Sequence, residues 1–297
     1  MSHANGSEAD ASKASRLLVL LVGVMVLVIG LFAIRSLIDA TSDRVARRND
    51  SGKTVVNTTT VDSKEVQSLR IDWGSGSVYV GVADDAEADG EILIRETYPD
   101  TGEGDHPLQL EVEQGELAID LGTTDTKRFP ETSRYLEVLL PPDYEGELDE
   151  VRVTMAAGEF EASQIGCAQL WAEASSGRIL IDGAAADDLR LVITSGDAKV
   201  EGAFSNDVQL DVGSGSIDVT NTVTPRTCKV TVGAGEATLA LPRDANVAIR
   251  SRVGAGAFDL GFAHRNEGDS LLVGKGDYQI NTLVADVGSG SLRIEPI

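Results

Sequence analysis

The residues with the most evident chemical potential are the glycines and serines of a hexapeptide that occurs three times. It reads DWGSGS at 72–77 and DVGSGS at both 211–216 and 286–291. Glycine-rich loops cradle phosphates when the glycines lead into a helix, because the helix N-terminus supplies backbone donors. Each copy here leads instead into alternating apolar and polar residues, which is the pattern of a strand. We therefore interpret the hexapeptide as a corner between strands and not as a phosphate site.

Aspartates after two of these corners raise the alternative of calcium binding. Asp218 ends the segment GSGSID and Asp259 ends GAGAFD, and both segments resemble the calcium-binding repeats of β-rolls. Those repeats recur every nine residues or so with the aspartate kept. The equivalent position here holds Lys199 and Thr238 in other copies. Calcium is kept as a weak alternative to a purely structural corner.

Other candidates for catalysis or metal binding are few. His3, His106 and His264 make no metal-ligand spacing with one another or with the two cysteines, and none lies in a catalytic motif. The formal net charge of -23 would repel phosphate backbones. We expect a protein that is not an enzyme, has no cofactor and binds no nucleic acid.

The corners belong to a repeat. With Gly215 as reference, apolar residues stand seven, five and three positions before it and two and four after it. The same template fits other glycines at intervals of about 20 residues, which indicates a solenoid whose stacked coils share one core. We expect the coils to stack in sequence order, with the last, at 292–297, as an open edge blunted by Pro296. The predicted corner glycines are Gly76, Gly115, Gly158, Gly177, Gly196, Gly215, Gly235, Gly256, Gly276 and Gly290.

The first half of the repeat is less regular than the second. The intervals on the two sides of Gly115 are 39 and 43 residues, each close to two coils with one glycine corner missing. Stretches typical of strands lie in those gaps at 92–98 and 135–141. Leu140-Pro141-Pro142 resembles Leu241-Pro242 and predicts a recurrent corner at which proline ends the strand.

Outward positions carry two further predictions. Glu159, Arg178 and Asp197 follow corners in successive coils and alternate in sign, which favours pairing between stacked strands. Tyr79 and Trp171 also fall at outward positions, where an exposed aromatic ring suits contact with a partner or a glycan. The alternative for both rings is packing beneath a loop or against the irregular first half.

Cys167 and Cys228 are expected to remain free thiols. Cys167 falls in a connection and Cys228 on an inward strand position. They lie three coils apart by the repeat count, roughly 14 Å at about 4.8 Å per coil. That distance exceeds the reach of a disulfide.

A membrane anchor is predicted before the repeat. Residues 17–34 contain no charge, and a helix of this length extends about 27 Å, enough to cross a bilayer. Arg16 and Arg35 flank the run and can reach the two interfaces. A cleaved signal peptide is the alternative, but the run is long and no A-x-A site follows it. The predicted segments are a polar tail at 1–16, a transmembrane signal anchor at 17–38, a juxtamembrane tether at 39–65 and a β-solenoid domain at 66–297.

Two arguments bear on the orientation of this anchor. Arginines after the run outnumber the basic residues before it, which favours a cytoplasmic C-terminal domain. Long domains, however, are translocated largely regardless of the flanking charge. We expect a single-pass protein of the cell membrane with its C-terminal domain outside the cytoplasm.

The serial corners, the segment LPRDANVAIRSRVGAGAFDL at 241–260 and the terminal DVGSGSLRIEPI resemble the bacterial putative-adhesin family of β-strand repeat proteins. The resemblance covers about residues 66–297 and implies an all-β domain, a single-stranded right-handed β-solenoid or β-helix-like repeat. It also implies a non-catalytic binding or adhesion surface for an unknown surface ligand or envelope protein, and no catalytic residues. The alternative is an envelope scaffold that self-stacks or docks on a membrane partner.

Overall fold

The computed structural model describes residues 54–83, 90–99, 108–121, 134–142, 144, 148–275 and 281–297. They belong to one unit, Thr54–Ile297, whose strands join in a 17-stranded sheet. The fold is therefore all-β, as predicted. The predicted anchor at 17–38, with Arg16 and Arg35, lies outside the described residues. Among the residues that are described, no helix combines the length and the apolar character needed to cross a membrane.

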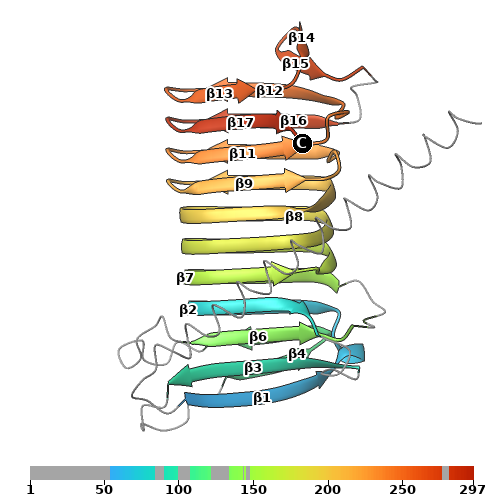
Figure 1. Ribbon diagram of the computed structural model, residues 1–297, viewed down its shortest axis with the longest axis vertical. Coiled ribbons are helices and arrows are strands. Elements are labelled where there is room, and N and C mark those ends of the chain that lie inside the picture. Colours follow the sequence, from blue (N-terminus) through green and yellow to red (C-terminus); the bar gives the residue numbers. More distant parts are fainter. Residues whose placement is uncertain are drawn as a thin grey trace, which may run out of the picture. The chain divides into compact units, whose positions relative to one another are not determined.

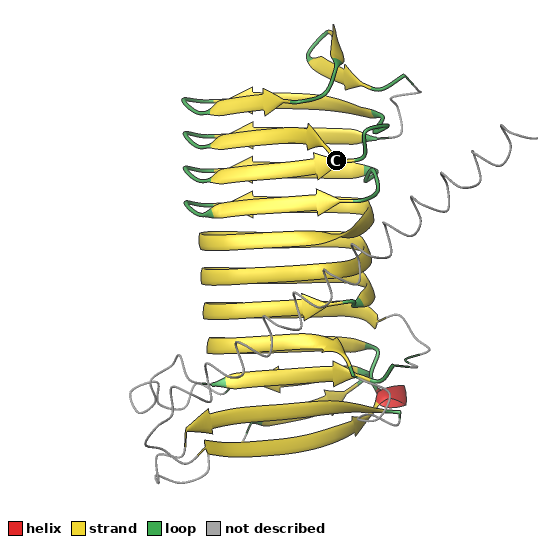
Figure 2. Cartoon of the chain, viewed as in Figure 1, coloured by secondary structure: helices red, strands yellow, loops and turns green. Residues whose placement is uncertain are grey.

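Parallel coils stack at the centre of this unit (Figure 1). β2 (Ser68–Val82) pairs with β7 (Leu148–Ser163), and β7 pairs with the first part of β8 (Gly166–Val212). β8 then continues through successive coils and pairs with β9 (Ser216–Asn221). Each coil has two strand segments joined at a glycine and closed by a short return segment. Figure 2 shows how completely strand accounts for this part of the chain.

The core is built from aliphatic ladders. Alternating residues of each strand point inward, so that Leu69, Val151 and Leu170 occupy neighbouring ladder positions and are at most 1% exposed. Burial of one such side chain contributes about 1.5–3 kcal/mol. Phe160 and Phe204 add the bulk that a chain with few aromatic residues otherwise lacks. One continuous cluster of buried residues runs from Val66 to Ile294.

The C-terminal coil does not stack last, and this corrects the expectation of sequence order. β16 (Thr282–Val287) lies between β10 (Thr227–Val232) and β12 (Val247–Val253). β17 (Ser291–Pro296) likewise lies between β11 (Glu236–Leu241) and β13 (Ala257–Leu260). The coil of β12 and β13 therefore precedes the coil of β16 and β17 in sequence but lies outside it in the stack (Figure 1).

Side-chain pattern explains this order. The inward row of β16 is Leu283, Ala285 and Val287, all at most 4% exposed, which suits a coil with a neighbour on each side. The corresponding row of β12 contains Ser251, which is exposed and suits the end of a stack. Pro296 is therefore not at an open edge: it stands opposite Leu241, and the Ile297 amide donates to the Leu241 carbonyl at 2.8 Å.

The N-terminal end has the same construction. β2 comes early in the chain but lies between β7 on one side and β5 (Glu116–Asp120) and β6 (Tyr135–Leu140) on the other. The predicted strand stretches at 92–98 and 135–141 are confirmed as β3 (Glu91–Pro99) and β6. They pair antiparallel, however, and so do not form serial coils.

Antiparallel strands extend the sheet beyond both end coils. β1 (Thr54–Asp62) pairs antiparallel with β3, and β4 (Gln109–Glu113) pairs antiparallel with β5. At the other end β15 (Ser270–Val273) pairs with β12 and β14 (His264–Glu267) pairs with β15. A short 3-10 turn, η1 (Ser63–Glu65), connects β1 to the first coil.

β1 lies within residues 39–65, which the sequence assigned to a tether. The segment TVVNTTTVD is rich in β-branched residues, and these favour a strand where a partner edge is present. That edge is β3, which is distant in sequence, so the pairing was not evident from the segment alone.

The proline corner is confirmed at both places. β6 ends at Leu140 and β11 at Leu241, each directly before a proline. The Tyr144 amide donates to the Pro141 carbonyl at 3.1 Å, and the Ala245 amide donates to the Pro242 carbonyl at 2.9 Å. Proline thus ends the strand and opens the same tight turn in two coils.

Candidate binding surface

Eight of the ten predicted corner glycines form one column along the stack. A Cβ atom on any of the seven later members would lie well under 3.0 Å from the carbonyl oxygen of the glycine in the neighbouring coil. Only glycine therefore allows the coils to approach at this corner. In order along the stack the column, here called the glycine column, is Gly76, Gly158, Gly177, Gly196, Gly215, Gly235, Gly290 and Gly256.

The two other predicted corners have different outcomes. Gly115 is not a coil corner: it lies in the turn between the antiparallel strands β4 and β5. Gln114 and Gly115 have φ values of 53° and 87°, as a two-residue hairpin turn of type I′ requires. The prediction failed because glycine serves both kinds of turn. Gly276 lies outside the described residues.

Four corners of the column border an open groove. They belong to the coils that contain β9, β11, β17 and β13, where the chain bends more widely than in the coils below; in Figure 2 these bends are the green loops at the left edge of the upper coils. The groove is shallow and widely open to solvent, with a volume of about 690 Å³. We call it the corner groove; its lining residues at the bends are Ser214, Gly215, Ala234, Gly235, Ala255, Gly256, Ser289 and Gly290.

The chemistry of the corner groove is that of hydroxyls and carboxylates. Ser216, Asp197 and Glu236 also line it, and the Ser216 hydroxyl donates to Asp197 at 2.6 Å. The amides of Ser214 and Ser289 donate to carbonyls of the neighbouring coil, so these backbone donors are used within the stack. The groove therefore offers hydroxyls and carboxylates to an extended polar molecule, and the carboxylates disfavour an anionic one.

The aspartates considered for calcium do not converge. Asp218 stands between Lys199 and Thr238 in the ladder, and Asp259 makes an ion pair with Arg293 at 3.3 Å. Each carboxylate therefore has a basic residue in the adjacent coil. In the part of the chain that the structure describes, no three histidine, cysteine or acidic residues are placed to hold a metal ion.

Trp171 is at an outward position, as expected, but its ring is covered by arginines. The guanidinium carbons of Arg152 and Arg190 lie 4.0 and 4.5 Å from the ring centroid. These residues come from the coils on either side, so cation–π contacts connect three successive coils. The indole ring thus joins coils together and is not a free platform for a glycan.

Tyr79 does not present a free ring to a partner. It packs against the irregular first half of the repeat, which was the alternative considered for it. Its ring lies on a small apolar cluster formed by Ala83, Leu93 and Leu139. Leu93 and Leu139 face each other across β3 and β6. The ring therefore helps to close the N-terminal end of the sheet, and its apolar surface is used within the chain.

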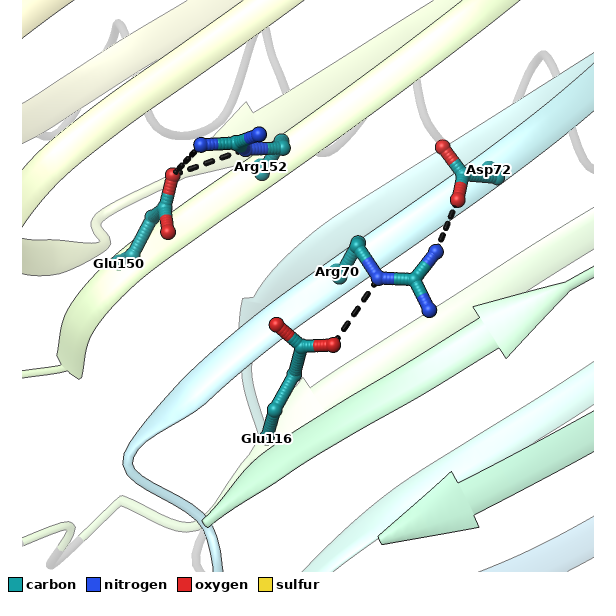
Figure 3. A network of polar contacts seen from close by, with 5 residues as sticks. All are labelled: Arg70, Asp72, Glu116, Glu150 and Arg152. Carbon is teal, nitrogen blue, oxygen red and sulfur yellow. Dashed lines mark hydrogen bonds and ion pairs between the residues drawn. The ribbon is translucent and has the colours of Figure 1, made fainter. Parts of the chain in front are cut away.

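The alternating series of outward charges forms one of its predicted pairs, while its third member, Asp197, accepts a hydrogen bond from Ser216. Arg178 lies 3.7 Å from Glu159 in the adjacent coil. Figure 3 shows a second set, in which Arg70 bonds Glu116 of the neighbouring strand at 3.0 Å and also Asp72. Ion pairs at this degree of exposure contribute at most about 1 kcal/mol each, so they set register more than stability.

Sequence reasoning missed a buried ion pair at the N-terminal end. Glu96 is 1% exposed and lies 3.1 Å from the guanidinium of Arg134, which also stacks over Tyr98 at 5.2 Å. Burial raises the pKa of Glu96, and the nearby Arg134 opposes that shift. The only available signal was a charged residue in the inward row of ILIRETY, where alternation predicts an apolar one.

Neither cysteine forms a disulfide, as predicted, and both are buried. The expectation that Cys167 lies in a connection is wrong, because it belongs to β8 and stands opposite Leu148 of β7. Cys228 belongs to the inward row of β10, at the ladder position of Val208. Burial raises the pKa of its thiol to about 12, with a smaller contribution from Asp207. The thiol is thus held protonated and away from solvent.

Three solved structures are similar over most of the chain. A putative cell adhesion protein from Clostridium sporogenes is 17% identical, with 82% of this chain and all of that chain covered and a TM-score of 0.41. A putative adhesin from Bacteroides fragilis is 13% identical, with 81% and 97% covered and a TM-score of 0.44. A putative lipid binding protein from Parabacteroides distasonis is 17% identical, with 81% and 98% covered and a TM-score of 0.40.

A comparison with curated proteins gives no match. The family model described as Toastrack DUF4097 matches residues 97–295, which is two thirds of the chain. The predicted family resemblance is thereby confirmed. This chain belongs to the Toastrack DUF4097 family.

Proposed function

We propose that this protein is a non-catalytic binding module, held at the cell membrane through residues 17–38, with its β-solenoid outside the cytoplasm. The observation that carries the proposal is the glycine column, which holds successive coils in register and so gives each outer face a fixed spacing. A surface of this kind is organised before any ligand arrives, which lowers the entropic cost of binding.

The corner groove is the part of this surface that best suits a ligand. It spans four coils, and serine hydroxyls and carboxylates line it. Its carboxylates and the net charge of -23 favour an uncharged or cationic ligand over an anionic one. A neutral glycan of a cell surface or an extended segment of an envelope protein meets these requirements.

Two variants at equivalent corners test this role. Ala234→Tyr places a ring in the groove, whereas Ser176→Tyr places the same ring one residue before Gly177, outside the groove lining. The probe is a printed array of neutral and anionic glycans, read with the full chain in detergent. We expect binding to neutral glycans that falls about tenfold in Ala234→Tyr, a loss of about 1.4 kcal/mol, and is unchanged in Ser176→Tyr. Equal binding by both variants would remove the groove from the proposal.

A further inference from the structure

The N-terminal edge strand β1 has another described strand on one side alone. Over the described residues β1 pairs only with β3, and its register runs from Thr54 opposite Pro99 to Asp62 opposite Glu91. Val56 on this strand is 55% exposed, more than any other large hydrophobic side chain of the described residues. An exposed strand edge is a template for pairing with a further strand.

Other edges of the sheet carry the charges that usually prevent such pairing. β4 contains Glu111 and Glu113, and β14 contains Arg265 and Glu267 among its four residues. β1, in contrast, has no charge, proline or glycine between Val55 and Val61, in a chain with a net charge of -23. β1 is therefore the edge that electrostatic repulsion protects least.

The sequence of β1 is complementary to itself. If two copies meet antiparallel with Thr58 on the two-fold axis, Val55 faces Val61, Val56 faces Thr60 and Asn57 faces Thr59. Six of these seven residues are β-branched, and pairs of this type stabilise antiparallel strands. Asp62 then lies beyond the paired segment, so no like charges face each other.

We propose that β1 pairs antiparallel with β1 of a second copy of this chain, with Thr58 opposite Thr58, so that the two sheets become one. An isologous contact of this kind closes as a dimer and leaves the outer strand faces and the corner groove uncovered. If the predicted anchor precedes β1, confinement to one membrane also raises the effective concentration of the two edges. The pairing does not depend on what the outer faces bind.

Single cysteines distinguish this register from any other contact. Thr58→Cys brings two thiols together on the axis, where facing Cα atoms are about 4.5–5.5 Å apart and a disulfide can form. Thr60→Cys lies on the same face of the same strand, but its two copies are four residues apart, about 13 Å, which is too far. The native cysteines are buried and do not interfere.

The experiment uses full-length chain in detergent, mild oxidation and a non-reducing gel. We expect about tenfold more disulfide-linked dimer from Thr58→Cys than from Thr60→Cys, because only the first pair meets disulfide geometry. Thr58→Lys, which places two ammonium groups face to face, should convert a dimer to a monomer in light scattering. Equal crosslinking of both cysteine variants would overturn the register.

Absence of crosslinking in both cysteine variants would overturn the proposal as well. If the thiol introduced by Thr58→Cys then reacts freely with a maleimide, the edge is open but unpaired. If that thiol is protected, another occupant covers β1, such as residues before Thr54 or a different protein. Loss of glycan binding with intact crosslinking would sink the proposed function and leave this inference standing.

Discussion

Gly177 has a φ of 120°, and a Cβ on it would overlap the carbonyl of Gly158. A Cβ added to Gly166, in the same coil, would meet no heavy atom within 4 Å. Position 177 therefore requires glycine, whereas position 166 can accept a larger residue.

We expect Gly177→Ala to lower the free energy of unfolding by about 3 kcal/mol or more, because the clash adds to a disfavoured φ. Gly166→Ala should change it by no more than about 0.5 kcal/mol. Urea unfolding of both variants beside the parent measures the difference. Similar midpoints for the two variants would show that the column does not limit coil stacking.

The Cys228 thiol provides a second test at a single residue. Its pKa is raised from 9.0 to about 12, mainly by burial, so the folded protein keeps a proton that the unfolded chain loses. Its contribution to stability is therefore complete below pH 9 and is lost as the pH rises toward 12.

The Cys228→Ala variant has no thiol, so it does not lose stability through the titration of this group. We expect the urea midpoint to fall less steeply above pH 9 than in the parent, since the tyrosines titrate in both proteins and cancel in the comparison. Parallel slopes for parent and variant would contradict the burial of this thiol.

At the scale of the elements, the regular coils could be predicted and their order could not. From Gly158 to Gly235 the repeat of about 20 residues matches neighbouring coils, because each contact is local in sequence. The placement of 282–297 beneath 247–260 depends instead on which inward row is more apolar, Leu283-Ala285-Val287 or Ile249-Ser251-Val253. The spacing between glycines does not indicate which of these two rows lies at the end of the stack.

The candidate site was predictable only in part. The glycine column follows from spacing, and the small residues at its corners are visible in the sequence. The wide bends at Gly215, Gly235, Gly256 and Gly290 share a second glycine two positions earlier, where the corner at Gly177 has a serine. The first copy of the hexapeptide, at 72–77, has the same glycine pair but keeps the positive φ of a tight corner, so the pair alone does not predict a wide bend. The contacts of two arginines with Trp171 likewise could not be predicted before the coil register was known.

Truncation before Thr282 tests the inserted coil. Without β16 and β17, both β10–β11 and β12–β13 lose a parallel neighbour. We expect amide hydrogen exchange to accelerate in β11 and β12 while β7 stays protected, because exchange reports local opening of each coil. Unchanged protection of β11 would mean that the coils stack in sequence order.

At the scale of the whole unit, neither terminal coil forms an end of the stack. β2 and the coil of β16 and β17 each have a parallel neighbour on both sides. Stacked repeats depend on contacts between neighbours, so their end coils are the least stable. Placing the chain's own terminal coils one position inward protects them from fraying and leaves antiparallel strands to cover the ends.

The central proposal for the whole molecule is display of the β-solenoid outside the cytoplasm. The most direct test of that display is protease digestion of a C-terminal tag in intact and in permeabilised cells. The account predicts that the tag is digested in intact cells, while a cytoplasmic marker stays whole until permeabilisation. A tag protected until permeabilisation would contradict it and would place the solenoid on the cytoplasmic side, as the arginines after the predicted anchor favour.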